Sequence, residues 1–228
     1  MIVYRLKMKL LSDTTFGRGD GVAGLIDREV EHDSNGFPYL RGRTLKGLLR
    51  EECENLIAIL SPEPDNVRKH WKNVAYDLFG QPGSTCKTAS KIHIGDACLP
   101  EDLRQAVAYQ IQEERNLTRV DILESLTTIR RQTAIDPKTG TPDEGSLRSS
   151  RVVLRDLEFT ADLRFEAKPS DEALALLVVG TLALRRVGSG RNRGRGYVRC
   201  WLFDSTAKEI TENLTLVKRF GLVKEEEP

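Results

Sequence analysis

Strict alternation of apolar and polar residues at the start of the chain is the feature that most limits its fold. Apolar side chains occupy the even positions from Ile2 to Leu10, and Arg5, Lys7 and Lys9 lie between them. This period of two is typical of a β-strand with one face in the core and the other in solvent. Because residues 152–166 alternate in the same way, the chain is predicted to form a sheet with one buried face.

Two other segments are predicted to be helices. Apolar residues from Leu45 to Leu60 recur in steps of three and four, which places them on one helix face, and Thr44 can cap the N-terminus. A second helix is expected from Ser170 to about Arg186, with acids at its positive end. Further expected elements are a short helix at 71–79, a polar helix at 101–116, and strands at 92–98 and 197–203.

The order strand, helix, strands, helix, strand predicts an α+β protein with a ferredoxin-like (RRM-like) palm. Two long insertions interrupt this pattern. The first follows residue 10 and is rich in Gly and Asp; the second, residues 127–150, contains Asp136-Pro137, Gly140, Pro142 and Gly145 and is expected to be a protruding hairpin or a mobile loop. We expect one domain covering residues 1–228.

Composition excludes several classes of protein. With 228 residues, 39% hydrophobic and 30% charged, the chain is too apolar for a disordered protein. No apolar run approaches the ~20 residues that span a bilayer, and the N-terminus has no signal-peptide pattern, so no membrane contact and a cytoplasmic location are expected. The four cysteines form no CxxC pair, which argues against zinc and disulfides and favours small buried apolar side chains.

Charge is unevenly distributed although the net charge is only +1. Six arginines and no acid lie between Arg185 and Arg199, and four basic residues and no acid lie between Arg41 and Arg50. Such blocks are most often solvated surface, so they favour a polyanion partner only modestly.

The glycine and arginine run from Gly188 to Gly196, the glycine loop, lies between a predicted helix and a predicted strand. A dinucleotide fingerprint requires the opposite order, which disfavours a nucleotide-binding enzyme. Glycines let backbone amides approach a phosphate chain, and arginines supply charge. The alternative is a tight turn with solvated arginines. We predict RNA contacts by Gly188, Gly190, Arg191, Arg193, Gly194 and Arg195.

A second basic segment surrounds the start of the first helix. Arg41 and Arg43 precede it, and the free amides of a helix N-terminus attract anions. Lys46 and Arg50 are four residues apart on one helix face, so both could reach a backbone phosphate. The alternative is a capped helix with ordinary surface cations.

At this point the sequence resembles the RAMP superfamily, in particular the backbone subunit of type III CRISPR effector complexes. The resemblance rests on Gly24-Leu25-Ile26-Asp27, then Val30, Asp33, Pro38 and Gly42-Arg43-Thr44-Leu45-Lys46-Gly47. It continues through Leu78-Phe79-Gly80, the strand from Ile92 to Asp96, the basic hairpin from Thr127 to Thr133 and the glycine loop. It therefore covers nearly the whole chain.

The resemblance implies a thumb hairpin, inserted at about residues 120–151, that enters between bases of guide and target RNA. It implies copies of the subunit stacked along CRISPR guide RNA with other effector subunits, and RNA contacts by Arg130 and Arg131. It also implies cleavage of target RNA that depends on a divalent metal, magnesium or manganese, and on an aspartate in the first long loop. Asp27 is the matching position, as catalytic residue and metal ligand, although Arg28-Glu29 replaces the family's usual small or polar residue and proline.

One carboxylate is acceptable for magnesium where RNA supplies further oxygens, and an aspartate can also position a 2′-hydroxyl for attack. Two other interpretations of the same residues stay open. One is a structural paralogue that binds RNA without cutting it. The other is a guide-precursor-processing ribonuclease that uses His32 as general acid or base.

Overall fold

The computed structural model describes residues 1–22, 25–60, 65–81, 89–114 and 116–220. It contains a sheet of four antiparallel strands in the order β2 (Ile92–Ile94), β5 (Glu158–Phe165), β1 (Ile2–Leu10) and β6 (Val198–Phe203). The helices α1 (Gly42–Ile59) and α5 (Asp171–Ala183) are the two crossovers between these strands. This βαββαβ arrangement confirms the predicted ferredoxin-like palm.

The alternation of β1 decides which face of the sheet is buried. Tyr4, Leu6, Met8 and Leu10 are buried, whereas Arg5 and Lys7 are exposed on the other face. The register pairs Ile2 with Phe165 and Lys9 with Glu158, so the alternating segments of β1 and β5 align their apolar residues on the same face.

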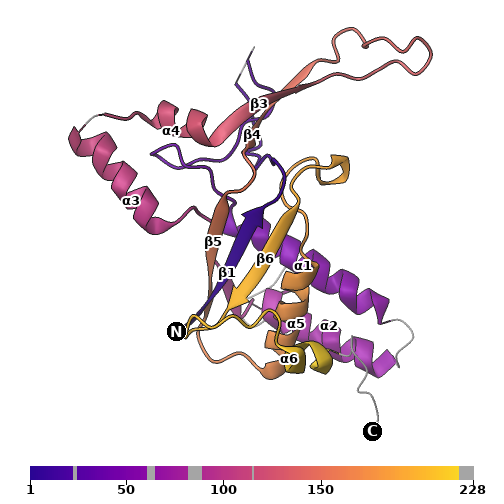
Figure 1. The fold of residues 1–228 in the computed structure, drawn as a ribbon. Helices are drawn as coiled ribbons and strands as arrows, with labels where there is room; N and C mark the ends of the chain where they lie inside the picture. Colours follow the sequence, from indigo (N-terminus) through magenta and orange to yellow (C-terminus); the bar gives the residue numbers. More distant parts are fainter. Residues whose placement is uncertain (23–24, 61–64, 82–88, 115, 221–228) are drawn as a thin grey trace.

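The helices α1, α2 (Asp65–Phe79), α5 and α6 (Leu214–Arg219) cover this buried face and leave the other face open (Figure 1). Helix α5 is buried from Leu174 to Thr181 without a break, because it lies between the sheet and the other helices. At Gly180 an added Cβ would collide with the thiol of Cys53 in α1, so glycine lets the two helices approach closely.

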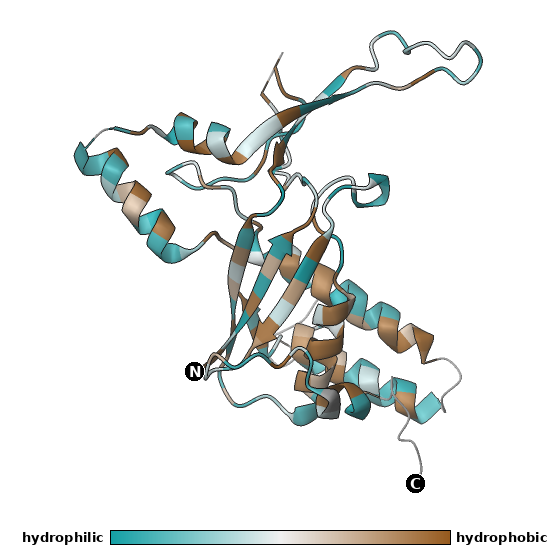
Figure 2. Ribbon diagram, in the orientation of Figure 1, coloured by the Kyte–Doolittle hydropathy of each residue, from teal (hydrophilic) through white to brown (hydrophobic). Residues whose placement is uncertain are grey.

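Two segments project from the palm, an arm of helices and a hairpin (Figure 1). The first is an arm of α3 (Glu101–Tyr109), a π-helical turn (Gln110–Glu114) and α4 (Arg119–Leu126); α3 buries none of its residues. The second is the hairpin of β3 (Thr127–Gln132) and β4 (Arg148–Val153), which has a long distal loop. Figure 2 shows that apolar residues concentrate in the palm and that the distal hairpin is largely hydrophilic.

Several predicted boundaries were wrong. Helix α1 begins at Gly42, and Thr44 does not cap it, since the amide of Gly42 donates to Oδ1 of Asp96 at 2.7 Å. Helix α2 is longer than predicted and begins at Asp65. Helix α5 ends at Ala183 because the chain after it turns to pair Arg186 with Tyr197 in an isolated bridge.

The strand predicted at 92–98 is divided. Regular pairing ends at Ile94, and beyond it only single bridges join Ala97 to Leu40 and Cys98 to Thr160. The polar helix predicted at 101–116 changes to a π-helical turn after Tyr109.

The cysteines agree with the expected apolar role where the structure describes them. Cys53 and Cys200 are buried, and burial raises the pKa of the Cys200 thiol to about 12. Cys98 is half-buried. Cys86 lies outside the described residues, as does Gly24 of the resemblance motif.

Among the residues that the structure describes, no helix is both long and apolar enough to span a membrane.

Candidate nucleic-acid interface

The two basic segments, which are far apart in the sequence, meet around one hollow of about 220 Å³. We call it the palm hollow. Its lining comes from three segments: the first long loop, the start of α1 and the glycine loop. The lining residues are Phe16, Gly17, Glu31, Tyr39, Leu40, Arg41, Thr44, Leu48, Gly188, Ser189 and Arg191.

The glycine loop is fixed to the first long loop. Gly188 and Gly196 both have positive φ (76° and 71°), and a Cβ at either position would collide with Thr14. The amide of Ser189 donates to the carbonyl of Thr15 at 2.9 Å. Because backbone geometry alone accounts for these glycines, the case for phosphate binding here rests on the arginines.

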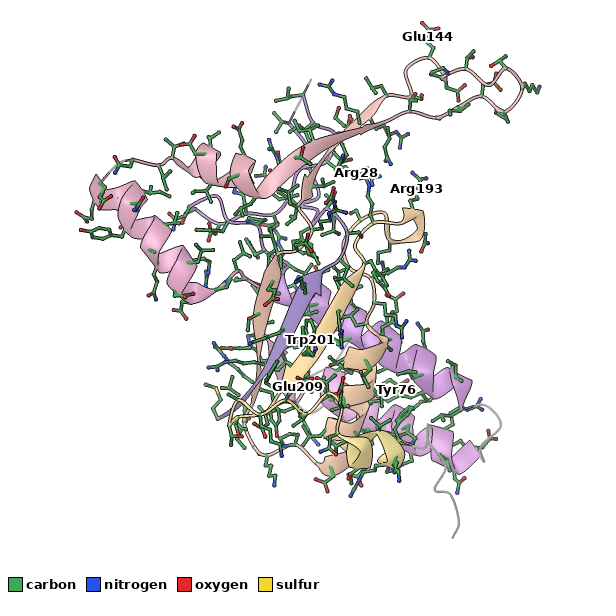
Figure 3. The ribbon with its side chains drawn as sticks, in the orientation of Figure 1. Arg28, Tyr76, Glu144, Arg193, Trp201 and Glu209 are labelled. Atoms are coloured by element: carbon green, nitrogen blue, oxygen red, sulfur yellow. The ribbon has the colours of Figure 1, made fainter. Side chains whose placement is uncertain are left out.

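Two arginines of this loop, Arg191 and Arg193, lie on a short 3-10 turn, η3 (Arg191–Arg193), between the left-handed residues Gly190 and Gly194, and Arg195 follows it. Arg193 extends toward the end of the molecule that carries the hairpin (Figure 3). Arg191 Nη1 lies 3.2 Å from Oε2 of Glu51 in α1. Within the described part of the chain, Arg193 and Arg195 have no ion-pair partner, so they are the most available cations of the loop.

A carboxylate holds the cation at the start of α1. Arg41 Nη2 lies 2.6 Å from Oε2 of the buried Glu31, although no hydrogen bond of good geometry reaches that oxygen. The Tyr39 hydroxyl donates to Oε1 of Glu31 at 2.9 Å, and burial, followed by this bond, raises the pKa of Tyr39. A phosphate in the palm hollow would therefore compete with Glu31 for Arg41.

The other predicted contacts on α1 lie elsewhere. Neither Lys46 nor Arg50 is among the residues that line the palm hollow. Arg50 donates to Oε1 of Glu54 at 2.7 Å and to the carbonyl of Gly80 at 3.3 Å. Lys46 is half-buried beside it, and burial, followed by the charge of Arg50, lowers the pKa of Lys46. Arg43 is exposed, but the first amide of α1 already has an anionic partner in Asp96.

The predicted cations of the hairpin have different surroundings. Arg130 Nη2 lies 2.8 Å from Oδ2 of Asp13, whereas Arg131 is exposed and has no ion-pair partner in the described residues. The backbone carbonyl of Asp13 also accepts from the amide of Gly196 at 3.0 Å. Asp13 therefore joins the hairpin to the glycine loop.

Asp27 lies against the hairpin. Its side chain is exposed, and its Oδ2 accepts from the amide of Ser149 at 2.6 Å while its own amide donates to the Ser149 carbonyl at 3.0 Å. Arg28 pairs with Ser150 in a parallel bridge, and its carbonyl accepts from the amide of Arg151 at 2.9 Å. Residues 27 and 28 thus lie beside β4 and are joined to it by one isolated bridge and backbone hydrogen bonds.

The fit to a metal ion is limited to one carboxylate. Among the described residues, no group of three or more His, Cys, Asp or Glu side chains could hold a metal. Oδ2 of Asp27 already accepts a hydrogen bond, so an ion at Asp27 would need most of its ligands from water and RNA phosphates. Magnesium commonly binds with such a set of ligands.

Sequence reasoning missed an ion pair next to this loop. Arg151 Nε lies 2.9 Å from Oε1 of Glu29, both side chains are largely buried, and Arg151 Nη1 donates to Oγ1 of Thr127 at 3.2 Å. The two charges are far apart in sequence and belong to no motif, so no signal in the sequence points to them. This ion pair also explains why a glutamate, Glu29, follows shortly after Asp27 in the loop.

His32, the residue of the guide-processing alternative, is half-buried, and its Nδ1 lies 3.1 Å from the carbonyl of Asp33.

A family model of the RAMP superfamily matches residues 7–199. This chain belongs to the RAMP superfamily. The match runs from β1 into β6 and includes the first long loop, the hairpin and the glycine loop. No curated protein matches.

Solved structures show the same fold. A chain of the Type III-B Cmr-beta bound to cognate target RNA aligns with a TM-score of 0.57 at 14% identity, over 88% of this chain and 96% of that one. A chain of Type III-B Cmr-beta in the apo state aligns with a TM-score of 0.58 at 15% identity, over 87% and 96%.

Proposed function

We propose that this RAMP protein is a guide-RNA-binding backbone subunit of a type III CRISPR effector complex, and that it cuts complementary target RNA in a metal-dependent step at Asp27. The palm hollow is the observation that carries the proposal, because it gathers Arg41, Arg191 and the glycine loop at one surface. Two structures with the same fold are from Type III-B Cmr-beta, one of them bound to cognate target RNA.

The chemistry of the palm hollow suits an RNA backbone more than particular bases. Arginines and backbone amides contact phosphates, which fixes the position of a strand without reading its sequence. A guide RNA varies in sequence, so a subunit that binds many guides needs this kind of contact. Arg193 and Arg195 add charge beside the hollow.

The hairpin suits a thumb that enters a duplex. Its large exposed apolar side chains are Ile129, Ile135 and Leu147, and the exposed Arg131 lies on the same hairpin. Apolar side chains that enter between bases unstack them, and nearby cations offset the phosphate charge. Through Asp13 the base of this hairpin is fixed to the glycine loop, which would align the thumb with bound guide.

Asp27 is the residue proposed to act on the target. The amide of Ser149 orients its carboxylate, which can accept a hydrogen bond from a ribose 2′-hydroxyl and direct that oxygen toward its phosphate. Arg28, exposed beside it, can pair with the phosphate. A divalent ion, when bound, would stabilise charge that develops on the phosphate oxygens.

A scaffold that does not cut is the second candidate. The bond from the Ser149 amide gives Asp27 a structural role, so the carboxylate has a reason to be present without chemistry. The guide-processing alternative has a simple signature of its own, since such an enzyme would cut repeat RNA alone, without metal, and would depend on His32.

The experiment that separates these candidates uses Asp27→Asn and Asp27→Ala in the assembled complex with guide RNA, with the active sites of other subunits disabled. The amide oxygen of Asn can still accept from Ser149, so Asp27→Asn keeps the structural bond and removes the charge. We expect both variants to bind complementary RNA nearly as tightly as wild type and neither to cut it, and chelation of divalent metal to mimic them. Cutting by Asp27→Asn at the wild-type rate would rule out Asp27 as the cutting residue, whereas a wild-type complex that binds target without cutting it would favour the scaffold.

A further inference from the structure

The segment that carries Asp27 is joined to the hairpin by more than the Asp27 side chain. Asp27 and Arg28 both donate backbone amides to the Ser149 carbonyl, at 3.0 and 3.3 Å, and the amide of Arg151 donates to the carbonyl of Arg28 at 2.9 Å. The loop therefore cannot shift along β4 without breaking several hydrogen bonds.

A buried ion pair between Glu29 and Arg151 continues this contact between the loop and β4. Glu29 lies two residues after Asp27, and only 6% of its side chain is exposed, against 13% for Arg151. Oε1 of Glu29 also accepts from the amide of Val30 at 2.8 Å, which fixes the carboxylate on its own loop. The planar guanidinium of Arg151 has donors in fixed directions, so it specifies where the carboxylate must lie.

Arg151 joins further segments as well. Its guanidinium donates to Thr127 at the start of β3, and its backbone carbonyl accepts from Oγ1 of Thr15 at 2.9 Å. The first long loop and both hairpin strands thus meet at this residue.

Stability alone does not explain a buried ion pair at this position. Taking two charges out of water is costly, and packed apolar residues of similar volume stabilise a fold at least as well. What the ion pair adds is directional placement of the loop.

We propose that Glu29 and Arg151 are positioning residues that hold the Asp27 loop on β4, so that the hairpin sets the position of the cutting carboxylate. This inference rests on the proposed function of Asp27. Its consequence is mechanical: when the hairpin seats in the guide-target duplex, the carboxylate moves with it, and a hairpin that does not seat leaves the carboxylate out of place.

The test compares variants in the assembled complex with guide RNA. Glu29→Gln keeps the shape and removes the charge, and Arg151→Lys keeps the charge and removes the planar fork. The double variant Glu29→Leu/Arg151→Met keeps the packing and removes the ion pair. It therefore provides a folded protein for the test if a single variant does not fold. Glu158→Gln is the control, because Glu158 pairs with Lys9 at 4.0 Å on the open face of the sheet.

Three quantities are measured for each variant: the single-turnover cleavage rate at saturating target, the Kd for target, and hydrogen exchange at the amides of Asp27, Arg28 and Arg151. We expect the cleavage rate to fall about 100-fold, as for a catalytic group displaced by about 1 Å, with unchanged Kd. Exchange protection should disappear at these amides and persist in β1 and β5. The control should change in none of the three.

Two results would overturn the inference. One is wild-type cleavage by the folded double variant; the other is slow cleavage with full exchange protection at the loop amides. Asp27→Asn in the same assay keeps the two claims apart. If Asp27→Asn cuts normally, the proposed nuclease fails, whereas an inactive Asp27→Asn beside fully active Glu29 and Arg151 variants defeats only the positioning role.

Discussion

Arg151 in the second hairpin strand and Glu29 in the first long loop form an ion pair, with 2.9 Å between Nε and Oε1, at the base of the hairpin. Only 13% and 6% of the two side chains are exposed. The pair fixes the loop that carries Asp27 against the hairpin, which projects from the palm. Both this ion pair and the palm hollow have measurable consequences.

The stability of the free protein should depend on the Glu29–Arg151 pair. Glu29→Ala leaves a buried guanidinium without its partner, which typically costs about 3–5 kcal/mol in the free energy of unfolding. Glu158→Ala removes an exposed carboxylate that pairs at 4.0 Å and should cost less than about 1 kcal/mol. Urea denaturation measures both changes. Equal small changes would show that the buried pair has no role in stability.

RNA affinity should depend on the unpaired arginines of the glycine loop. Arg193→Ala/Arg195→Ala should weaken binding of single-stranded RNA regardless of its sequence, because arginine–phosphate bonds carry no base information. The slope of log affinity against log salt should flatten by ~0.7 for each phosphate that the variant no longer neutralises. Arg68→Ala on α2, where Arg68 pairs with Asp65, is the control and should change neither quantity. An unchanged slope in the double variant would reduce the loop to a structural turn.

Much of this arrangement is predictable from the sequence. The period of two at residues 2–10 and the helical steps after Leu45 require a sheet with one buried face and a helix across it, and both are present. The glycine loop and the basic start of α1 are each recognisable as candidate anion sites. Both signals are local, because they depend on residues that are close together in the chain.

The pairing of these segments is not predictable in the same way. Nothing in the sequence shows that Arg191 lies against Glu51, or that Arg50 donates to the carbonyl of Gly80. Thr44 is the wrong cap for α1 because Asp96, which is distant in the chain, supplies the acceptor. Such interactions depend on tertiary packing, which periodicity does not describe.

The glycines of the loop should differ in how well they tolerate a side chain. Gly194 has a φ of 76° but open space around its Cβ position, so Gly194→Ala should cost only about 1–2 kcal/mol of backbone strain. At Gly196 the added Cβ would also collide with the Val187 carbonyl, so Gly196→Ala should lower the Tm clearly more. Thermal unfolding of the two variants measures the difference. A Tm for Gly196→Ala equal to that of Gly194→Ala would contradict the described docking of the loop.

The distal hairpin should be protected when RNA binds. Residues 133–147 are largely exposed in the free chain, and Lys138 offers trypsin an accessible site there. We expect cleavage at Lys138 in the free protein and protection in the complex with guide and complementary target, since the hairpin would be held in the duplex. Non-complementary target serves as the control and should protect less. The same cleavage rate in all three states would show that this segment is not a thumb.

Binding of a guide RNA at the palm hollow and the glycine loop beside it is tested most directly by sequencing the RNA that co-purifies with the protein and its native partners. We expect short RNAs with a common repeat-derived 5′ segment followed by varied sequence, in amounts that fall when Arg193 and Arg195 are replaced by alanine. Recovery of no RNA, or of random cellular fragments in equal amounts with both proteins, would contradict guide binding at this surface.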